Sequence, residues 1–169
     1  MQQTPSFDTL TSVFLFAVAM GFFLFGILMV NKNKRNYPIA FLVLSFSAIL
    51  FSYVLYWTKY NTIISYFNSF QFIGYYSTGP LLYLYIHKLY NIKMKYFALH
   101  FILTVLWVFL TLVIWCRYIF DYQFGFSPIF TFFANYILII SHLMIYFFLI
   151  LRLIKKNNKT ETEFEKIRY

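Results

Sequence analysis

Five stretches of the sequence contain no Asp, Glu, Lys or Arg, and each is long enough to cross a lipid bilayer. They are residues 9–31, 36–58, 60–87, 96–116 and 122–151. A membrane-spanning α-helix needs about 20 predominantly apolar residues. Hydrophobic residues make up 62% of the chain and charged residues 11%, whereas an ordinary soluble domain has about 25% charged residues. The sequence therefore predicts an all-α integral membrane protein with five transmembrane helices.

The basic residues lie between these stretches and are distributed unequally. Twelve of the 14 follow the first, third and fifth stretches: Lys32, Lys34, Arg35, Lys88, Lys93, Lys95, Arg152, Lys155, Lys156, Lys159, Lys166 and Arg168. The other two gaps contain Lys59 and Arg117. Short loops rich in Lys and Arg stay in the cytoplasm. This pattern predicts a multi-pass membrane protein with an outside N-terminus and a cytoplasmic C-terminus, and it explains the net charge of +9 without nucleic acid.

Within these stretches we expect helices over residues 9–30, 38–58, 62–90, 96–119 and 129–155. Residues 1–155 then form a transmembrane helical bundle with the lipid bilayer as its surroundings. Residues 156–169 are polar and include three glutamates among basic residues. They are expected to form a cytoplasmic tail, or the start of a linker to a further domain.

Proline inside the third expected helix marks a break in its backbone. Pro80 follows Gly79 and lacks the N–H that would bond the carbonyl of Tyr76, so a kink is expected at this point. Ser77 and Thr78 are close enough in sequence to bond freed backbone groups, which is how membrane helices tolerate such breaks. The carbonyl of Tyr76 is expected to face the bundle or an ordered partner group.

The residues around this break resemble a known family. The distinctive run is 79–86 (GPLLYLYI), with 25–28 (FGIL), 31–36 (NKNKRN), His100-Phe101 and 163–167 (EFEKI) as further points of similarity. Over about residues 10–169 the chain resembles the membrane-embedded N-terminal region of bacterial AraC-type transcriptional regulators. The resemblance implies a signal-sensing module linked to transcription regulation, located in the bacterial inner (cytoplasmic) membrane. In that family further membrane helices and a DNA-binding domain with two helix-turn-helix units follow, so DNA is expected as a partner only through a downstream domain absent from this chain.

Polar side chains at membrane depth are candidates for ligand contact, because they are costly unless they face the bundle interior. Counting about 1.5 Å per residue places Gln71 and Asn135 at similar depth, on the order of 10 Å below the outer boundary. The candidate ligand-binding residues are Gln71, Asn135, Asn68, Tyr75 and Tyr76, which could share a cavity with Ser52 and Tyr53. Alternatively, these groups only hold the helices together. The sequence does not identify the ligand.

The three histidines do not suggest a metal site. His87 and His100 are expected near the cytoplasmic boundary and His142 roughly 15 Å deeper, so they are not level, and a zinc site needs three or four ligands. His142 remains a candidate titratable group, with a hydrogen-bonded structural histidine as the alternative. The sequence contains no catalytic constellation and no intramembrane carboxylate pair. We therefore expect no enzyme activity, no cofactor and no metal.

Two classes of function remain. The preferred one is a membrane-embedded signal-input module that relays a change in the bundle to a cytoplasmic segment. The alternative is a stand-alone membrane interaction subunit or small transport component. A reading frame that continues past Tyr169 into further helices and a helix-turn-helix domain would favour the first. Small residues four apart, Ala17 with Gly21 and Ala48 with Ser52, predict close helix contact within the chain or in a homodimer.

Overall fold

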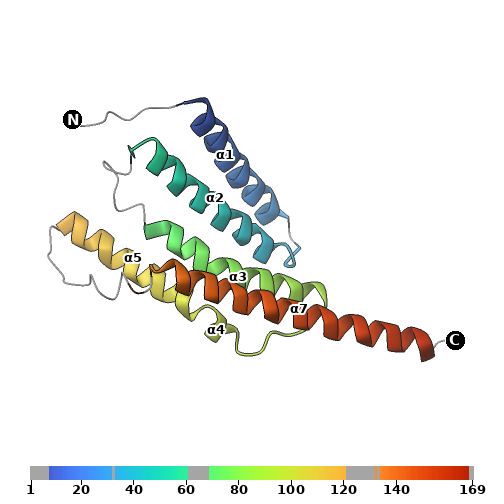
Figure 1. Cartoon of the computed structure of the whole chain (residues 1–169). Coiled ribbons are helices and arrows are strands. Elements are labelled where there is room, and N and C mark those ends of the chain that lie inside the picture. Colours follow the sequence, from blue (N-terminus) through green and yellow to red (C-terminus); the bar gives the residue numbers. More distant parts are fainter. Residues whose placement is uncertain (1–7, 32, 61–68, 121–131, 133, 168–169) are drawn as a thin grey trace.

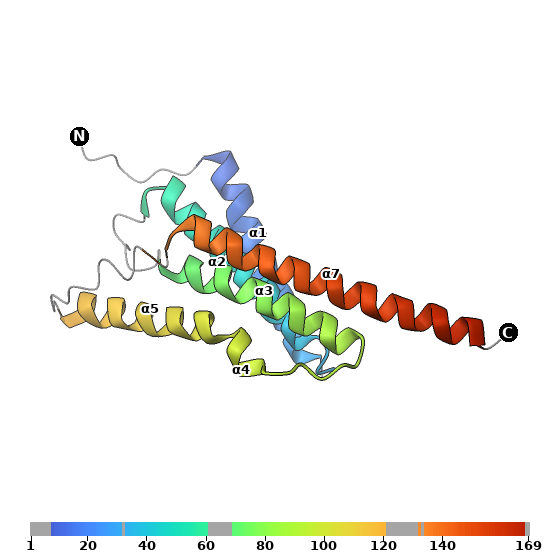
Figure 2. The ribbon, with the colours of Figure 1, turned by 60° about the horizontal axis from the view of Figure 1, so that its bottom comes forward.

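The computed structural model describes residues 8–31, 33–60, 69–120, 132 and 134–167, which contain helices and no β-strand. The helices are α1 (Thr9–Val30), α2 (Tyr37–Trp57), α3 (Phe70–Leu89), α4 (Phe97–His100), α5 (Ile102–Phe120) and α7 (Tyr136–Ile167). The helix α3 lies at the centre, where it contacts α2, α5 and α7, and α1 packs on α2 (Figure 1). The second view shows α5 below α3, and α7 extending beyond the other helices toward the C-terminus (Figure 2).

Three helices are long and apolar enough to cross a membrane: Thr9–Val30, Tyr37–Trp57 and Tyr136–Asn157. The prediction of an all-α, multi-pass membrane protein is confirmed at this level. A shorter apolar helix covers Ile102–Cys116. The buried residues of α3 include Gly74, Ser77, Gly79 and Pro80, because the helix is surrounded by other helices and need not present an apolar surface to lipid.

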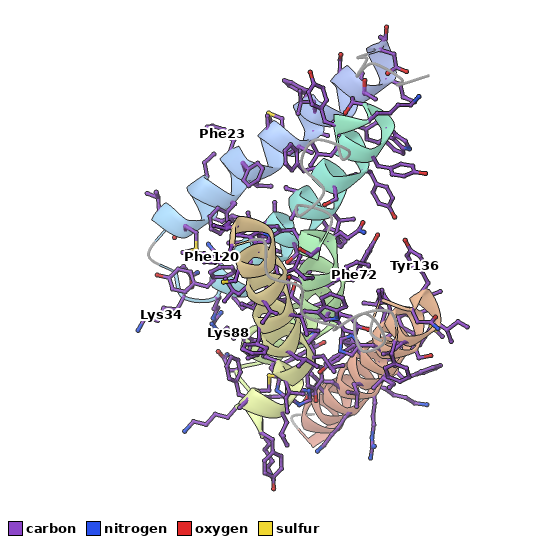
Figure 3. All side chains as sticks on the ribbon, turned by 90° about the vertical axis from the view of Figure 1, so that its left-hand side faces the viewer. Phe23, Lys34, Phe72, Lys88, Phe120 and Tyr136 are labelled. Atoms are coloured by element: carbon purple, nitrogen blue, oxygen red, sulfur yellow. The ribbon has the colours of Figure 1, made fainter. Side chains whose placement is uncertain are left out.

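The exposed side chains of α1 indicate the medium that surrounds this helix. Its described buried residues are Thr11 and Val18, and large apolar side chains project from it; Phe23 is 63% exposed and points away from the other helices (Figure 3). A helix that is apolar all round belongs in a core or a bilayer. Asp8 caps its N-terminus, and the N–H and hydroxyl of Thr11 hold the pKa of the Asp8 carboxyl below its usual value.

The expected helix over 96–119 is interrupted, so that prediction was wrong in its continuity. The backbone of Tyr96 is left-handed, with φ of 53°, and α4 ends at His100 before α5 begins at Ile102. The hydroxyl of Tyr146 donates a hydrogen bond to the carbonyl of His100 at 3.1 Å. In a continuous helix the carbonyl of His100 would accept from the backbone N–H of Thr104. Here it accepts from Tyr146 of α7, which explains why the helix is interrupted.

Two other expected helices have different bounds. The helix α3 begins at Phe70, and residues 62–68 of the expected 62–90 helix lie outside the described residues. The last helix begins at Tyr136, not at 129, and runs without a break to Ile167; residues 129–131 are not described. The polar tail therefore continues α7, because its sequence contains good helix formers and no Gly or Pro that would end the helix.

Two basic loops meet at one end of the bundle. The Nζ of Lys88, in the last turn of α3, donates to the carbonyl of Lys34 at 2.8 Å. The Nη2 of Arg35 donates to Oδ1 of Asn91 at 2.8 Å. Figure 3 shows Lys34 and Lys88 side by side at this end. The loops that follow the first and third uncharged stretches are thus on the same side, which is the alternation that a multi-pass topology requires.

Candidate functional site

The carbonyl that Pro80 leaves without a partner in α3 is bonded by another helix. Thr104 Oγ1 of α5 donates to the carbonyl oxygen of Tyr76 at 3.0 Å. Ser77 and Thr78 do not take this role, because their hydroxyls donate to the carbonyl of Gly74 at 3.0 and 2.8 Å. The proline in α3 thus creates a polar contact between α3 and α5.

Next to the proline, Gly79 permits a close contact between α3 and α7. A Cβ at this position would lie 2.6 Å from Cδ2 and 2.8 Å from Cγ of the Tyr146 ring. Real Cβ atoms essentially never approach another heavy atom so closely. Only glycine lets the Tyr146 ring lie flat against the backbone of α3. The helix α3 runs without interruption from Phe70 to Leu89, so the break is the missing hydrogen bond at Pro80. At this point α3 touches α5 through Thr104 and α7 through Tyr146.

Six aromatic and imidazole rings continue from this point through the bundle. We call them the Tyr–His cluster: Tyr76, Tyr83, His87, His100, His142 and Tyr146. The centroid of Tyr146 lies 4.9 Å from that of His142, 5.7 Å from that of His100 and 6.0 Å from that of Tyr83. Tyr83 in turn lies 4.5 Å from His87 and 5.2 Å from His100, and Tyr76 lies 5.2 Å from His142. The cluster joins α3, α4 and α7.

The hydroxyl of Tyr146 determines which ring nitrogen of His100 carries a hydrogen. It donates its single proton to the carbonyl of His100, and it also lies 3.0 Å from Nδ1 of the same histidine. Because a phenol has one proton to donate, the second bond requires the hydrogen on Nδ1 of His100. In His142, Nδ1 has no hydrogen-bond partner among the described residues, so packing between Tyr76 and Tyr146 holds this ring.

A stacked aromatic core lies beside the cluster. Trp107 of α5 is fully buried and stacks on Phe72 of α3, with centroids 4.6 Å apart and an interplanar angle of 15°. Tyr76 of α3 also stacks on Trp107, with ring centroids 6.0 Å apart, and Ile139 of α7 belongs to the same core. The core holds α3, α5 and α7 in one arrangement around the break.

A cavity of about 520 Å³, partly open, borders the break through Ser77 and Thr104. We call it the apolar groove. Its lining residues are Phe22, Phe41, Leu44, Ser45, Ala48, Phe51, Ser52, Phe70, Ile73, Gly74, Ser77, Leu81, Phe101 and Thr104. Small residues of α2 and α3 form much of this lining. Phenylalanine rings of α1, α2 and α3, together with Phe101 just before α5, form another part, and Leu44, Ile73, Leu81 and Thr104 complete it. Its volume lies within the roughly 300–1,000 Å³ of ligand pockets.

The structure does not bring the sequence-predicted ligand residues into this groove. Asn135 is exposed, and its Oδ1 accepts from the N–H of Ile137 at 2.9 Å, so it caps the start of α7. Tyr75 shares a 2.7 Å hydrogen bond with Tyr53, and Tyr76 is fully buried in the aromatic core. Gln71 is half-buried. Asn68 lies outside the described residues, and Ser52 is the predicted neighbour that lines the groove.

Two important residues were missed by the sequence reasoning. Tyr146 contacts Gly79 at the break in α3, the rings of His100 and His142, and the carbonyl of His100. Its i, i+4 spacing from His142 was a usable signal that these two residues lie on one face of the same helix. Thr104 had no such signal, because its partner is 28 residues away on another helix. The expected separation of the three histidines by depth also missed that tyrosine rings connect them.

The described residues contain no group of three or more His, Cys, Asp or Glu placed to hold a metal ion. Cys116 is free and exposed on α5. Comparison with protein-family models, curated proteins and solved structures finds no match to this chain. The features that bear on the function of the chain are a bonded backbone break in α3, a ring cluster that connects it to α7, and an apolar groove.

Proposed function

We propose that the chain is a membrane-embedded signal-input module, similar to that of AraC-type regulators, which relays a change in the bundle to the cytoplasmic segment at its C-terminus. The observation that carries the proposal is the continuity of α7. This helix contacts the break through Tyr146 and then runs on to Ile167, roughly 30 Å further at about 1.5 Å per residue. Its C-terminal part projects beyond the other helices (Figures 1 and 2).

The backbone break supplies an element with two alternative arrangements. In the structure, Tyr76 bonds Thr104 and Gly79 contacts Tyr146. A change in the bend of α3 would move the carbonyl away from Thr104 and the backbone away from Tyr146, and so displace α7. A signal can shift this equilibrium only if it binds one arrangement better than the other. The 32-residue helix α7 then carries the displacement out of the bilayer as a rigid rod.

The proposed topology has five spans, with the N-terminus outside and the C-terminus in the cytoplasm. The unequal distribution of basic residues supports it, as does the contact between the two basic loops at one end. Alkaline phosphatase fused after Tyr169 should be inactive, whereas a fluorescent protein fused there should be bright. The same two reporters fused after Lys59 should give the reverse pattern. An active phosphatase after Tyr169 would refute the orientation.

The relay is tested by measuring a distance in the whole chain. Spin labels are attached at Lys34→Cys and Lys155→Cys in a Cys116→Ser background, and the protein is reconstituted in lipid nanodiscs. Pro80→Ala restores the N–H that α3 lacks, so the bend should change and the distance between the labels should shift by about 2 Å or more. Gly26→Ala is the matched control, because a Cβ there would meet nothing within 4 Å. Equal distances in all three proteins would contradict the relay.

A further inference from the structure

We infer that the apolar groove binds one acyl chain of an anionic phospholipid, whose phosphate lies on the basic rim formed by Lys34, Arg35 and Lys88. This binding does not depend on the proposed signalling role. The groove lies between helices of a membrane protein, so lipid chains are the medium around it. An apolar cavity of about 520 Å³ is far too large to remain empty at the packing density of protein interiors.

The walls of the groove select an apolar occupant. The hydroxyls of Ser45 and Ser77 lie 2.8 Å apart, and they lie 2.9 and 3.0 Å from the carbonyl oxygens of Phe41 and Gly74. Because each hydroxyl has one proton, one serine donates to the other, which in turn donates to its own carbonyl. Ser52 donates to the carbonyl of Ala48 at 3.1 Å. These hydroxyls already have partners and demand none from a ligand. A ligand with polar groups along its length would lose its hydration without compensation, whereas a hydrocarbon chain loses nothing.

The length of the groove fits a single chain from one leaflet. Its lining on α2 runs from Phe41 to Ser52, a distance of about 16 Å along a helix. Half the thickness of the hydrocarbon core is about 15 Å. Small side chains of α2 and α3 make room for the chain, because Ser45, Ala48 and Gly74 leave space that larger residues would fill.

The charge at one end of the groove fits an anionic headgroup. Leu81, in the wall, lies seven residues before Lys88 on α3, or about 10 Å. The Nζ of Lys88 donates to the backbone carbonyl of Lys34, and the guanidinium of Arg35 donates to the side-chain oxygen of Asn91. The basic rim therefore lies at the end of the same two helices that form the floor. Basic sites between transmembrane helices at the membrane surface bind anionic lipid headgroups.

Retention of lipid by the full chain tests this inference. The chain is reconstituted with equal amounts of palmitoyl-oleoyl phosphatidylglycerol and the corresponding phosphatidylcholine, extracted in mild detergent and measured by native mass spectrometry. The wild type should retain one phosphatidylglycerol. Ala48→Phe places a ring in the groove and should reduce retention about tenfold or more, because the ring takes the place of the chain's packing contacts with the walls and a loss of about 1.4 kcal/mol is a tenfold change. Ser52→Leu should act in the same direction.

Matched variants separate the groove from general effects on the membrane surface. Ala19→Phe is the control for Ala48→Phe, because Ala19 is exposed on α1, and it should retain lipid like the wild type. Lys34→Gln with Arg35→Gln and Lys88→Gln should remove the preference for phosphatidylglycerol over phosphatidylcholine. Lys155→Gln, an exposed change on α7, should not.

Three outcomes would overturn the inference. Equal retention by Ala48→Phe and Ala19→Phe would show that the groove is not the site. Equal retention of the two phospholipids by the wild type would show that the basic rim does not bind the headgroup. If oleate added to the vesicles displaces the phospholipid and remains as the bound species, then the groove takes a free fatty acid. A shifted label distance in Pro80→Ala with unchanged lipid binding would leave the proposed relay intact.

Discussion

Gly79→Ala is expected to destabilise the chain strongly, although the same change stabilises most helices. The new methyl group would meet the Tyr146 ring at 2.6 Å, and the ring cannot retreat without breaking its bonds to His100. Overpacking of this kind costs about 1–3 kcal/mol, which exceeds the roughly 0.5–1 kcal/mol that alanine gains over glycine in a helix. Thermal unfolding in detergent should therefore give a clearly lower Tm for Gly79→Ala.

Gly26→Ala is the matched control for this prediction. A Cβ at Gly26 would contact nothing within 4 Å, so this variant should have a Tm equal to or above that of the wild type. In a Tyr146→Ala background the clashing ring is gone, and the cost of Gly79→Ala should fall toward zero. A Gly79→Ala protein as stable as Gly26→Ala would show that α3 and α7 do not approach as closely as the structure has them.

The sequence was sufficient where a property depends on the local chain alone. The helices α1 and α2 lie within one residue of the expected ranges, because uninterrupted apolar composition determines them. Pro80 must leave the carbonyl of Tyr76 without its helical partner in any context, because proline has no N–H. The identity of the group that replaces it depends on the position of α5, and no local pattern contains that information.

The sequence was insufficient where another helix decides the outcome. The interruption between α4 and α5 depends on Tyr146, which donates a hydrogen bond to the carbonyl of His100 although the two residues are 46 positions apart in the sequence. Depth counting assigned Asn135 to a pocket, but it could not predict that this side chain would cap α7 instead. The groove forms because small residues of α2 lie opposite small residues of α3. The sequence alone does not show that these two helix faces pack together, so it could not predict the groove.

The hydrogen bond from Thr104 to Tyr76 should depend on Pro80, and a double-mutant cycle can measure this dependence. In the wild type, Thr104→Val removes the donor that satisfies the Tyr76 carbonyl. A buried acceptor left without a partner costs about 1–3 kcal/mol, although hydrogen bonds between membrane helices average about 0.6 kcal/mol. We therefore expect Thr104→Val to lower the free energy of unfolding by about 1 kcal/mol.

In the Pro80→Ala background the same change should cost almost nothing. The N–H of the alanine can donate to the carbonyl of Tyr76 within α3, so Thr104 is no longer needed as a donor. Unfolding of the four proteins in mixed micelles should thus give a coupling energy near the whole cost of Thr104→Val in the wild type. Thr111→Val, in the next turns of the same helix, is the control and should show the same effect in both backgrounds. Equal costs of Thr104→Val in both backgrounds would mean that the proline does not create the contact, and the relay would lose its two-state element.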